Sequence, residues 1–331
     1  LRNPLFWCHP FVRKYLQYYH WADAIVCAPG GICMGGFMSW EHEEQLLIAM
    51  KLGKPLFYYG RSIGPFWDEP KEKKIFKQQA VRILNYASYV SLRDATSIKI
   101  AKDLGINNVI ETTDTAFLDY PQVEIPEEIL REIGGKEYVV FVPNSLIWHY
   151  FYRGKATGEE VVAYWSKVAR VIAKHYPNHK IVMLPQTSLQ GKAFDDKYLF
   201  QDIQKHCPEL DIFVSDDIYS SDIQQQIIRG ADAVFGARYH TIVFAINNNV
   251  PFVSLSYEHK MSGLLNEIGL QDEMIDITQL FTSESVNKSI LEQLDELIPQ
   301  IYRSAEGRIM AKEKAEGAFL QFVNHISMLQ R

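Results

Sequence analysis

Residues 231–255 carry the clearest fold signal in the chain and read ADAVFGARYHTIVFAINNNVPFVSL. The short apolar run at 233–235 predicts a buried strand, the segment at 241–248 predicts an apolar helix, and the run at 252–255 predicts a second strand. A strand, a helix and a strand in this order form a βαβ unit with parallel strands. The stretch therefore predicts a parallel sheet covered by helices.

The same alternation of short apolar runs and longer amphipathic segments extends along most of the chain. Ahead of a connection at residues 121–135 it predicts a helix at 9–20, strands at 24–28, 55–59, 89–92 and 108–111, and helices at 40–52, 72–86 and 95–104. After the connection it predicts strands at 138–142, 180–184 and 211–214, helices at 159–175, 193–206 and 221–229, and a helix stop at Gly230. The segment at 284–331 is almost wholly helical in pattern.

Two such series predict an α/β protein with two Rossmann-like, doubly wound domains that face a cleft. We place an N-terminal domain at residues 1–125, a C-terminal domain at 136–283, and C-terminal helices at 284–331 that pack back toward the N-terminal domain. The chain opens at Leu1 without a methionine and soon enters a helix. We therefore expect the first domain to lack part of its start.

The composition narrows the class of protein without naming one. The 331 residues carry a formal net charge of -6 and a sequence pI of about 6.0, so no general basic field favours nucleic acid. Cys8, Cys27, Cys33 and Cys207 form no CxxC pair, which favours reduced thiols in the cytoplasm. No apolar run is long enough for a membrane span, so we expect at most peripheral membrane contact.

Gly236-Ala237-Arg238-Tyr239-His240 joins a predicted strand directly to a predicted helix. A helix N-terminus attracts anions, and the Arg238 fork matches a carboxylate or a phosphate. His240 is suited to deliver a proton near neutral pH. The alternative is equally open: Arg238 is a surface residue paired with an acid, and His240 caps its own helix.

A second arginine, in Ser91-Leu92-Arg93-Asp94, also follows a strand and precedes a helix. Either Arg93 binds a ligand or it pairs with Asp94 or Asp114, and Asp94 is a plausible helix N-cap in both cases.

The glycine-rich segment Ala28-Pro29-Gly30-Gly31 predicts a loop after the first strand. Gly30 and Gly31 either cradle a ligand or form a flexible turn. The spacing matches neither GxGxxG nor a P-loop.

Several loops at strand ends carry weaker candidates for ligand binding. Arg61 and Ser62 stand in a predicted loop at 60–66, and the pattern favours a structural crossover over direct contact with a ligand. Trp148 and His149, followed by Tyr150, Phe151 and Tyr152, either stack on sugars or pack beneath their loop. Gln186, with Thr187 and Ser188, binds hydroxyl groups or caps its loop. Glu258 and Lys260 open a helix, and capping alone explains the acid.

The sequence favours no metal site. His175 and His179 have HxxxH spacing, but Pro177 breaks the helix that would place both on one face, and the acid of HExxH is absent. We interpret the pair as a surface turn.

In chain order these segments resemble the blocks of the polysaccharide pyruvyltransferase family. The blocks are Ala28-Pro29-Gly30-Gly31, residues 60–66, Ser91-Leu92-Arg93-Asp94, Asp114-Thr115-Ala116-Phe117, and Gly236 to His240 with residues 250–257. Each block alone is weak, but five in order are specific. The resemblance covers residues 22–270.

The resemblance implies a GT-B-like fold with the acceptor side in the first domain and the donor side in the second. It implies phosphoenolpyruvate as the donor, no cofactor, and a glycan or lipid-linked oligosaccharide as the acceptor, at the inner face of the membrane. Arg93 and Arg238 look like the phosphoenolpyruvate anchors, beside Tyr239, Gly30 and Gly31, and His240 looks like the catalytic histidine, with Arg93 assisting. Tyr239 departs from the leucine common in its block, and the family's N-terminal Gly/Asn-rich segment is not visible before Leu1.

Two other functions are compatible with the same residues. One is a GT-B glycosyltransferase that uses a nucleotide sugar, because fold alone does not decide chemistry. The other is a catalytically silent glycan-binding assembly protein.

Overall fold

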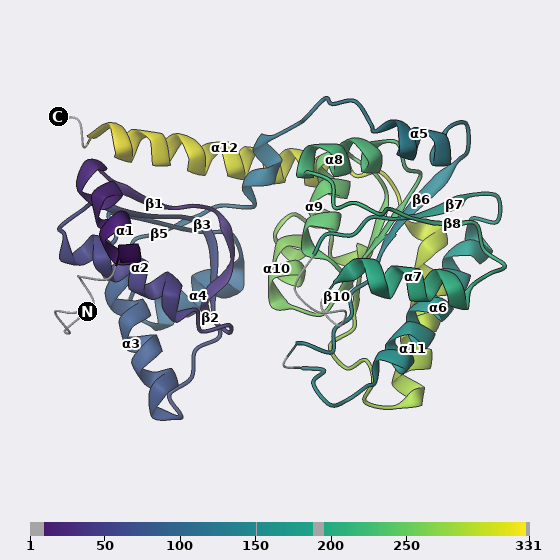
Figure 1. Cartoon of the computed structure of the whole chain (residues 1–331), viewed down its shortest axis with the longest axis horizontal. Coiled ribbons are helices and arrows are strands. Elements are labelled where there is room, and N and C mark those ends of the chain that lie inside the picture. Colours follow the sequence, from purple (N-terminus) through teal and green to yellow (C-terminus); the bar gives the residue numbers. More distant parts are fainter. Residues whose placement is uncertain (1–9, 150, 188–194, 329–331) are drawn as a thin grey trace. The chain divides into compact units, whose positions relative to one another are not determined.

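A computed structural model describes residues 10–149, 151–187 and 195–328, which divide into two compact units (Figure 1). The first unit comprises Leu1–Leu118 and Ala311–Arg331, and the second comprises Asp119–Met310. Both are α/β units with parallel sheets, as the sequence predicts. The exact domain limits expected from the sequence stay a prediction.

The first unit is built on a five-stranded sheet in which all neighbouring strands run parallel. Its strands are β1 (Ile25–Cys27), β2 (Gly30–Gly35), β3 (Leu56–Gly64), β4 (Tyr89–Leu92) and β5 (Val109–Glu111). Their order is β1-β3-β4-β5, and β2 also pairs with β3. The helices are α1 (Pro10–Trp21), α2 (Trp40–Lys51), α3 (Lys71–Tyr86) and α4 (Ala95–Asp103), with a 3-10 turn at Thr115–Leu118.

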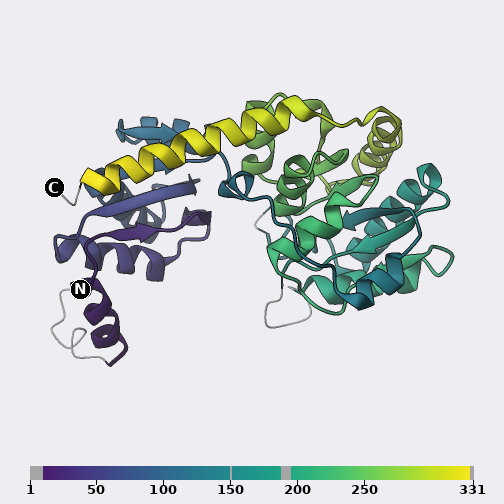
Figure 2. The same cartoon turned by 90° about the horizontal axis from the view of Figure 1, so that it is seen from above.

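Helices cover both faces of this sheet because alternate residues of a strand point to opposite faces. Leu56 and Tyr58 of β3 join the core beneath α2, α3 and α4. Phe57 and Tyr59 face α12 (Ala305–Ser327), whose Phe322 ring stacks on Tyr59 with ring centroids 4.5 Å apart. The helix α12 lies along this face of the sheet in Figures 1 and 2.

Two predicted loops of the first unit are strands, so those expectations were wrong. The glycine-rich segment after β1 forms β2, and residues 60–64 prolong β3. Gly35 (φ 139°) pairs with Gly64, and a Cβ on Gly35 would lie 2.4 Å from the Gly64 backbone nitrogen. Glycine therefore permits two backbones to approach closely here, although the same residues normally indicate a turn.

The second unit contains a six-stranded parallel sheet in the order β11-β10-β9-β6-β7-β8. Its strands are β6 (Tyr138–Val142), β7 (Lys180–Met183), β8 (Ile212–Val214), β9 (Val234–Gly236), β10 (Phe252–Ser256) and β11 (Met274–Asp276). The surrounding helices are α5 (Glu127–Ile133), α6 (Gly158–His175), α7 (Asp196–His206), α8 (Ser221–Arg229), α9 (Tyr239–Asn247), α10 (His259–Glu267) and α11 (Glu284–Leu297), with 3-10 turns at Gln271–Glu273 and Ile298–Gln300. The strand order reverses between β6 and β9, which is where open α/β sheets bind ligands at their carboxyl ends.

Most predicted elements are present with ends shifted by a few residues. The strands β4 and β6 and the helix α8 match their predicted limits, and Gly230 is the C-cap of α8. The sequence missed β11, whose three residues are too few to show periodicity, and α5, which lies in the predicted connection. Within the described ranges, no helix is long and apolar enough to cross a membrane.

Candidate functional site

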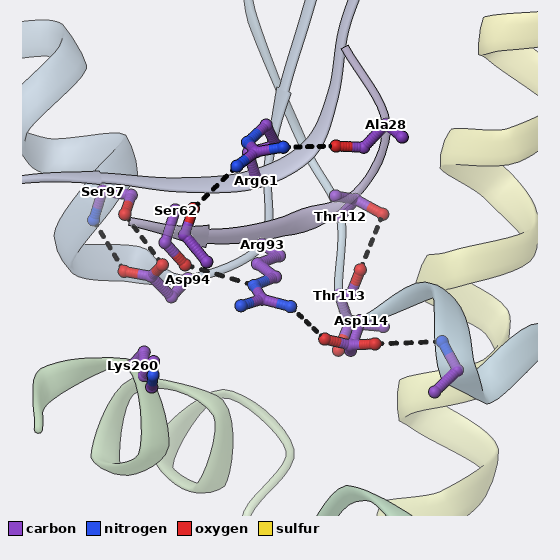
Figure 3. A network of polar contacts seen from close by, with 12 residues as sticks. Ala28, Arg61, Ser62, Arg93, Asp94, Ser97, Thr112, Thr113, Asp114 and Lys260 are labelled. Atoms are coloured by element: carbon purple, nitrogen blue, oxygen red, sulfur yellow. Dashed lines mark hydrogen bonds and ion pairs between the residues drawn. The ribbon is translucent and has the colours of Figure 1, made fainter. Parts of the chain in front are cut away.

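In the first unit, Arg93 follows β4 and is held by an acid from another loop (Figure 3). Its Nη1 pairs with the Asp114 carboxylate, and its Nε donates to the Ser62 hydroxyl at 3.2 Å. The other oxygen of Asp114 accepts from the backbone N–H of Ala116 at 3.0 Å. Arg93 is only 3 % exposed. Of the two acids considered from the sequence, Asp114 is therefore the partner.

Asp94 has the separate role expected of an N-cap. Its side chain accepts hydrogen bonds from the backbone N–H and the hydroxyl of Ser97, each at 2.8 Å, at the start of α4. This cap fixes the chain directly after Arg93.

Arg61 lies inside the sheet instead of in a loop. Its guanidinium donates to the carbonyls of Ala28 (2.6 Å) and Gly31 (3.1 Å) and contacts the Cys33 sulfur at 3.1 Å. A Cβ on Gly30 would lie 3.2 Å from this guanidinium. Arg61 thus fastens β2 to β3, which explains how a charged residue is accommodated within a buried strand.

The other weak candidates in this unit, Ser62, Gly30 and Gly31, differ in how far they are buried. Ser62 is fully buried beside Arg93, whereas Gly31 is exposed and has open space where a Cβ would stand. Ligand contact by Gly30, Gly31, Arg61 or Ser62 stays a prediction.

In the second unit, Arg238 stands at the N-cap position of α9 shortly after β9, beside the reversal of strand order, and its side chain makes no capping hydrogen bond. Its Nη2 pairs with Asp196 at the start of α7. The second carboxylate oxygen of Asp196 accepts from the backbone N–H groups of Gln186 (3.0 Å) and Thr187 (2.9 Å). Three elements thus converge on one buried carboxylate, which fixes the orientation of the guanidinium.

Arg238 retains hydrogen-bonding capacity after this contact. Its side chain is 12 % exposed, and among the described residues its Nε has no hydrogen-bond partner. The alternative described Arg238 as a surface residue paired with an acid. The pairing is confirmed, with Asp196, but the side chain is mostly buried. An oriented guanidinium with an unused donor is suited to bind an oxyanion.

His240 is exposed on the first turn of α9. Its ring lies edge-on to Tyr239, with centroids 5.3 Å apart, and 5.9 Å from Phe244. Tyr239 itself is buried, with Lys260 Nζ 5.7 Å from its ring centroid. The helix thus directs Tyr239 inward and leaves His240 accessible beside Arg238.

Of the two interpretations left open for His149, the structure agrees with packing beneath the loop. It is 1 % exposed and Tyr152 is fully buried, so neither ring is available to stack on a sugar in this conformation. His149 Nε2 lies 3.1 Å from Glu258 Oε1, and Lys260 Nζ lies 2.8 Å from Glu258 Oε2. Burial alone would raise the pKa of Glu258, but Lys260 and His149 outweigh it and lower the pKa to about 2.

Glu258 therefore bridges two basic side chains instead of capping a helix. It stands at the N-cap of α10 without a side-chain capping bond. Its acceptor-binding role, like that of His149, stays a prediction.

Trp148 and Gln186 are tied to neighbouring polar groups. The indole N–H of Trp148 donates to the side-chain oxygen Oδ1 of Asn144 at 3.2 Å. The Nδ2 of Asn144 donates in turn to the Tyr257 hydroxyl at 3.0 Å. Gln186 Nε2 donates to Gln224 at 3.1 Å. Tyr150 and Ser188 lie outside the described residues.

Sequence reasoning missed Asp196 and Asn144 at this sheet edge. Asn144 directly follows the β6 region, so its position after a strand was a usable signal. Asp196 is the first residue of α7, where an acid is common for the sake of the helix alone, and nothing local to it indicates the pairing with Arg238.

Within the described ranges, no group of three or more His, Cys, Asp or Glu side chains is placed to hold a metal ion. His175 and His179 bind different acids, with Nε2 of His175 2.7 Å from Asp295 and that of His179 3.1 Å from Asp232.

Comparison with known proteins adds a family to this geometry. The model of the polysaccharide pyruvyl transferase family matches residues 2–259. The amylovoran biosynthesis protein AmsJ of Erwinia amylovora is 24% identical over 310 residues, which cover 89% of this chain and 71% of AmsJ.

Solved structures support the fold. A putative UDP-N-acetylglucosamine 2-epimerase from Listeria monocytogenes aligns with a TM-score of 0.53 at 10% identity, over 90% of this chain and 70% of that one. A UDP-GlcNAc 2-epimerase from Neisseria meningitidis aligns with a TM-score of 0.50 at 12% identity, over 86% and 72%. At such identity the likeness concerns the GT-B-like fold alone.

Proposed function

The chain belongs to the polysaccharide pyruvyl transferase family, and we propose that it moves a pyruvate ketal from phosphoenolpyruvate to a sugar of a surface glycan or its precursor. The acceptor is a glycan or a lipid-linked oligosaccharide with two suitably spaced hydroxyl groups. We place the reaction in the cytoplasm, at the inner face of the membrane, with no cofactor.

The observation that carries the proposal is the pair Arg238 and His240 at one helix N-terminus. Phosphoenolpyruvate brings a carboxylate and a phosphate into a protein of net negative charge, so the positive charge must be local. Arg238 offers a guanidinium that Asp196 orients, and it stands at the N-cap position of α9, where the positive end of the helix dipole favours an anion. Arg93 is the second anchor in this proposal, although its contacts to Asp114 and Ser62 leave it more enclosed.

The chemistry proceeds in two additions to the same carbon. His240 donates a proton to the methylene carbon of phosphoenolpyruvate, which makes C2 electron-poor, and a sugar hydroxyl adds to C2. The proton of that hydroxyl returns to His240. The C2–O bond to phosphate then breaks, the second hydroxyl adds to C2, and its proton leaves with the phosphate. One phosphoenolpyruvate and one diol thus yield one ketal and one phosphate.

Asp196 supports this chemistry without touching the reactants. Because its carboxylate is held by two backbone N–H groups, it keeps the Arg238 guanidinium in one orientation. Correct placement of a reactant contributes to rate by reducing the entropy lost in the transition state.

The direct test compares donors and then identifies the product. Phosphoenolpyruvate, a UDP-sugar and a GDP-sugar are titrated separately into the protein, and phosphate release is measured with and without acceptor glycan. We expect binding of phosphoenolpyruvate, phosphate release only with glycan present, and a ketal on the glycan by mass spectrometry. Binding of a nucleotide sugar alone would favour a glycosyltransferase, and glycan binding without phosphate release would favour an assembly protein.

A further inference from the structure

A hollow of the first unit lies between α2 and α3. Its cavity volume is about 860 Å³. Volumes of roughly 300 to 1,000 Å³ are typical of sites for small ligands. The hollow is lined by charged, amide and aromatic side chains, which separates it from an ordinary apolar gap between helices.

Glu43 is the unusual residue of this hollow. It is 1 % exposed, and among the described residues neither carboxyl oxygen has a hydrogen-bond partner. Burial raises the pKa of Glu43 to about 8, so the group is a neutral carboxylic acid at neutral pH. A buried polar group without a partner destabilises the fold, and such groups in a cavity indicate a ligand site.

Three further polar side chains at the hollow make no internal polar contact within the described part of the chain. They are Glu44, Gln79 and Arg82. Together with Glu43 they supply a carboxylate, an amide, a guanidinium and a carboxylic acid. Their donors and acceptors are therefore available to a ligand.

Two aromatic rings stand at the same hollow and are fixed in place. Trp40 packs edge-on against Phe76 with ring centroids 5.1 Å apart, and it remains 37 % exposed. The Tyr86 hydroxyl donates to the Lys54 carbonyl at 2.9 Å, and Tyr86 remains 36 % exposed. Each ring presents apolar surface that loses little conformational freedom when it is covered.

This combination suits a sugar. The C–H face of a pyranose packs on an aromatic ring, and its hydroxyl groups pair with planar carboxyl, amide and guanidinium groups. Glu44 offsets one of the two cations that line the hollow, Arg82 and Lys51, and Glu43 is neutral, so the lining carries one net positive charge and disfavours a cationic ligand.

We propose that the hollow between α2 and α3 binds sugar residues of the acceptor glycan other than the residue that receives the ketal. This proposal rests on the proposed function for the identity of the glycan. Water does not reach the Glu43 oxygens in this conformation, so binding includes a rotation of the Glu43 side chain toward the sugar hydroxyls.

The test measures how affinity depends on glycan length. Unketalated glycan from the producing organism with this gene deleted is cleaved to single repeats and to fragments of several repeats, and each is titrated calorimetrically. We expect wild type to bind the longer fragments about tenfold more tightly or better, because they engage both sites at once.

Two matched double variants on α3 locate the effect. Gln79→Ala with Arg82→Ala removes a half-buried amide and an exposed cation of the hollow, and Lys74→Ala with Gln78→Ala removes an exposed cation and an exposed amide outside it. We expect the first pair to lose the preference for long fragments and the second to keep it. Glu43→Gln keeps a donor and an acceptor and should retain the preference, whereas Glu43→Leu should lose it.

Hydrogen exchange of the wild-type protein tests the proposal without any variant. Long fragments should slow amide hydrogen exchange in α2 and α3 of the wild-type protein. Equal affinity for short and long fragments, or an undiminished preference in the Gln79→Ala and Arg82→Ala protein, overturns the proposal. Failure of the proposed function is visible separately as the absence of ketal in the product, because the titrations do not depend on turnover.

Discussion

The two units bury glutamates in opposite ways. Glu43 in the first unit has no cationic partner among the described residues, and burial raises its pKa to about 8. Glu258 in the second unit is equally enclosed, but Lys260 and His149 lower its pKa to about 2. Burial by itself therefore does not set the charge of these groups, because the neighbours decide it.

The arginines differ between the units in a related way. Arg61 binds backbone carbonyls and a sulfur, and thus serves the fold. Arg238 is oriented by Asp196 and keeps an unused donor beside the exposed His240. Both guanidinium groups keep a buried Nε without a partner among the described residues, so their surroundings separate them: Arg61 lies within a buried strand, whereas Arg238 lies at a helix N-terminus beside an exposed histidine.

The largest expected effect concerns His240. If His240 delivers the proton, His240→Ala lowers turnover by about 100-fold or more while the donor still binds. His240→Gln should be nearly as inactive, because an amide donates a hydrogen bond but delivers no proton at neutral pH. Near wild-type turnover in the Gln variant would assign His240 to positioning and direct the search for the acid to His149 and Glu258.

The next effect compares the proposed anchors. Arg238→Ala and Arg93→Ala should each weaken phosphoenolpyruvate binding by about 1.5 to 3 kcal/mol, or about 10- to 150-fold, because a charge-assisted pair is lost. Lysine at either position should restore little, since it lacks the fork. Calorimetric titration of the donor checks this, and unchanged affinity in both Ala variants would remove both residues from the donor site.

Arg61 provides the contrast within the first unit. Arg61→Lys loses part of the fork that binds Ala28 and Gly31, so the free energy of unfolding should fall by about 1 to 3 kcal/mol. Donor and acceptor KM should not change. An altered KM with an unchanged melting temperature would return Arg61 to the binding site.

The two glutamates should respond to pH with opposite sign. Glu43 releases its proton near pH 4.5 in the unfolded chain and near pH 8 in the folded one. Its contribution to the free energy of unfolding therefore falls as pH rises through this window, by up to about 1.4 kcal/mol per pH unit. Denaturant titrations should show Glu43→Gln gaining stability relative to wild type between pH 5 and pH 8.

Glu258 is the matched counterpart of Glu43. Its stabilising contribution is present above pH 4.5 and is lost as pH falls toward 2, because its folded-state pKa is lowered. Glu258→Gln should thus destabilise the protein at neutral pH, where Glu43→Gln stabilises it. Parallel pH profiles for the two variants would contradict the comparison.

The smallest expected effect is that of a chelator. The proposed reaction draws its positive charge from arginines and a helix N-terminus, so EDTA should leave turnover unchanged. Loss of activity with EDTA and recovery with a divalent ion would contradict this.

Local pattern predicted the framework of the fold because buried strands and amphipathic helices are local features. It failed at β2 and at the end of β3, where glycines and Arg61 belong to a close strand pair instead of a turn. At the candidate site, strand-end position indicated Arg93, Arg238 and His240. The pairing of Arg238 with Asp196 joins residues 42 positions apart, and the burial of His149 depends on Glu258. No spacing rule reveals such contacts.

The helix α12 makes the first unit discontinuous in sequence, since Ala311–Arg331 joins Leu1–Leu118. During translation the ribosome releases the whole second unit before the helix that covers Phe57, Tyr59 and Tyr89 exists. The aromatic face of the first sheet thus waits uncovered while about 190 further residues are added, at rates of about 5 to 20 residues per second. We expect chaperones to bind a nascent chain in this state. A chain truncated before α12 would expose the same aromatic surface and would be prone to aggregate.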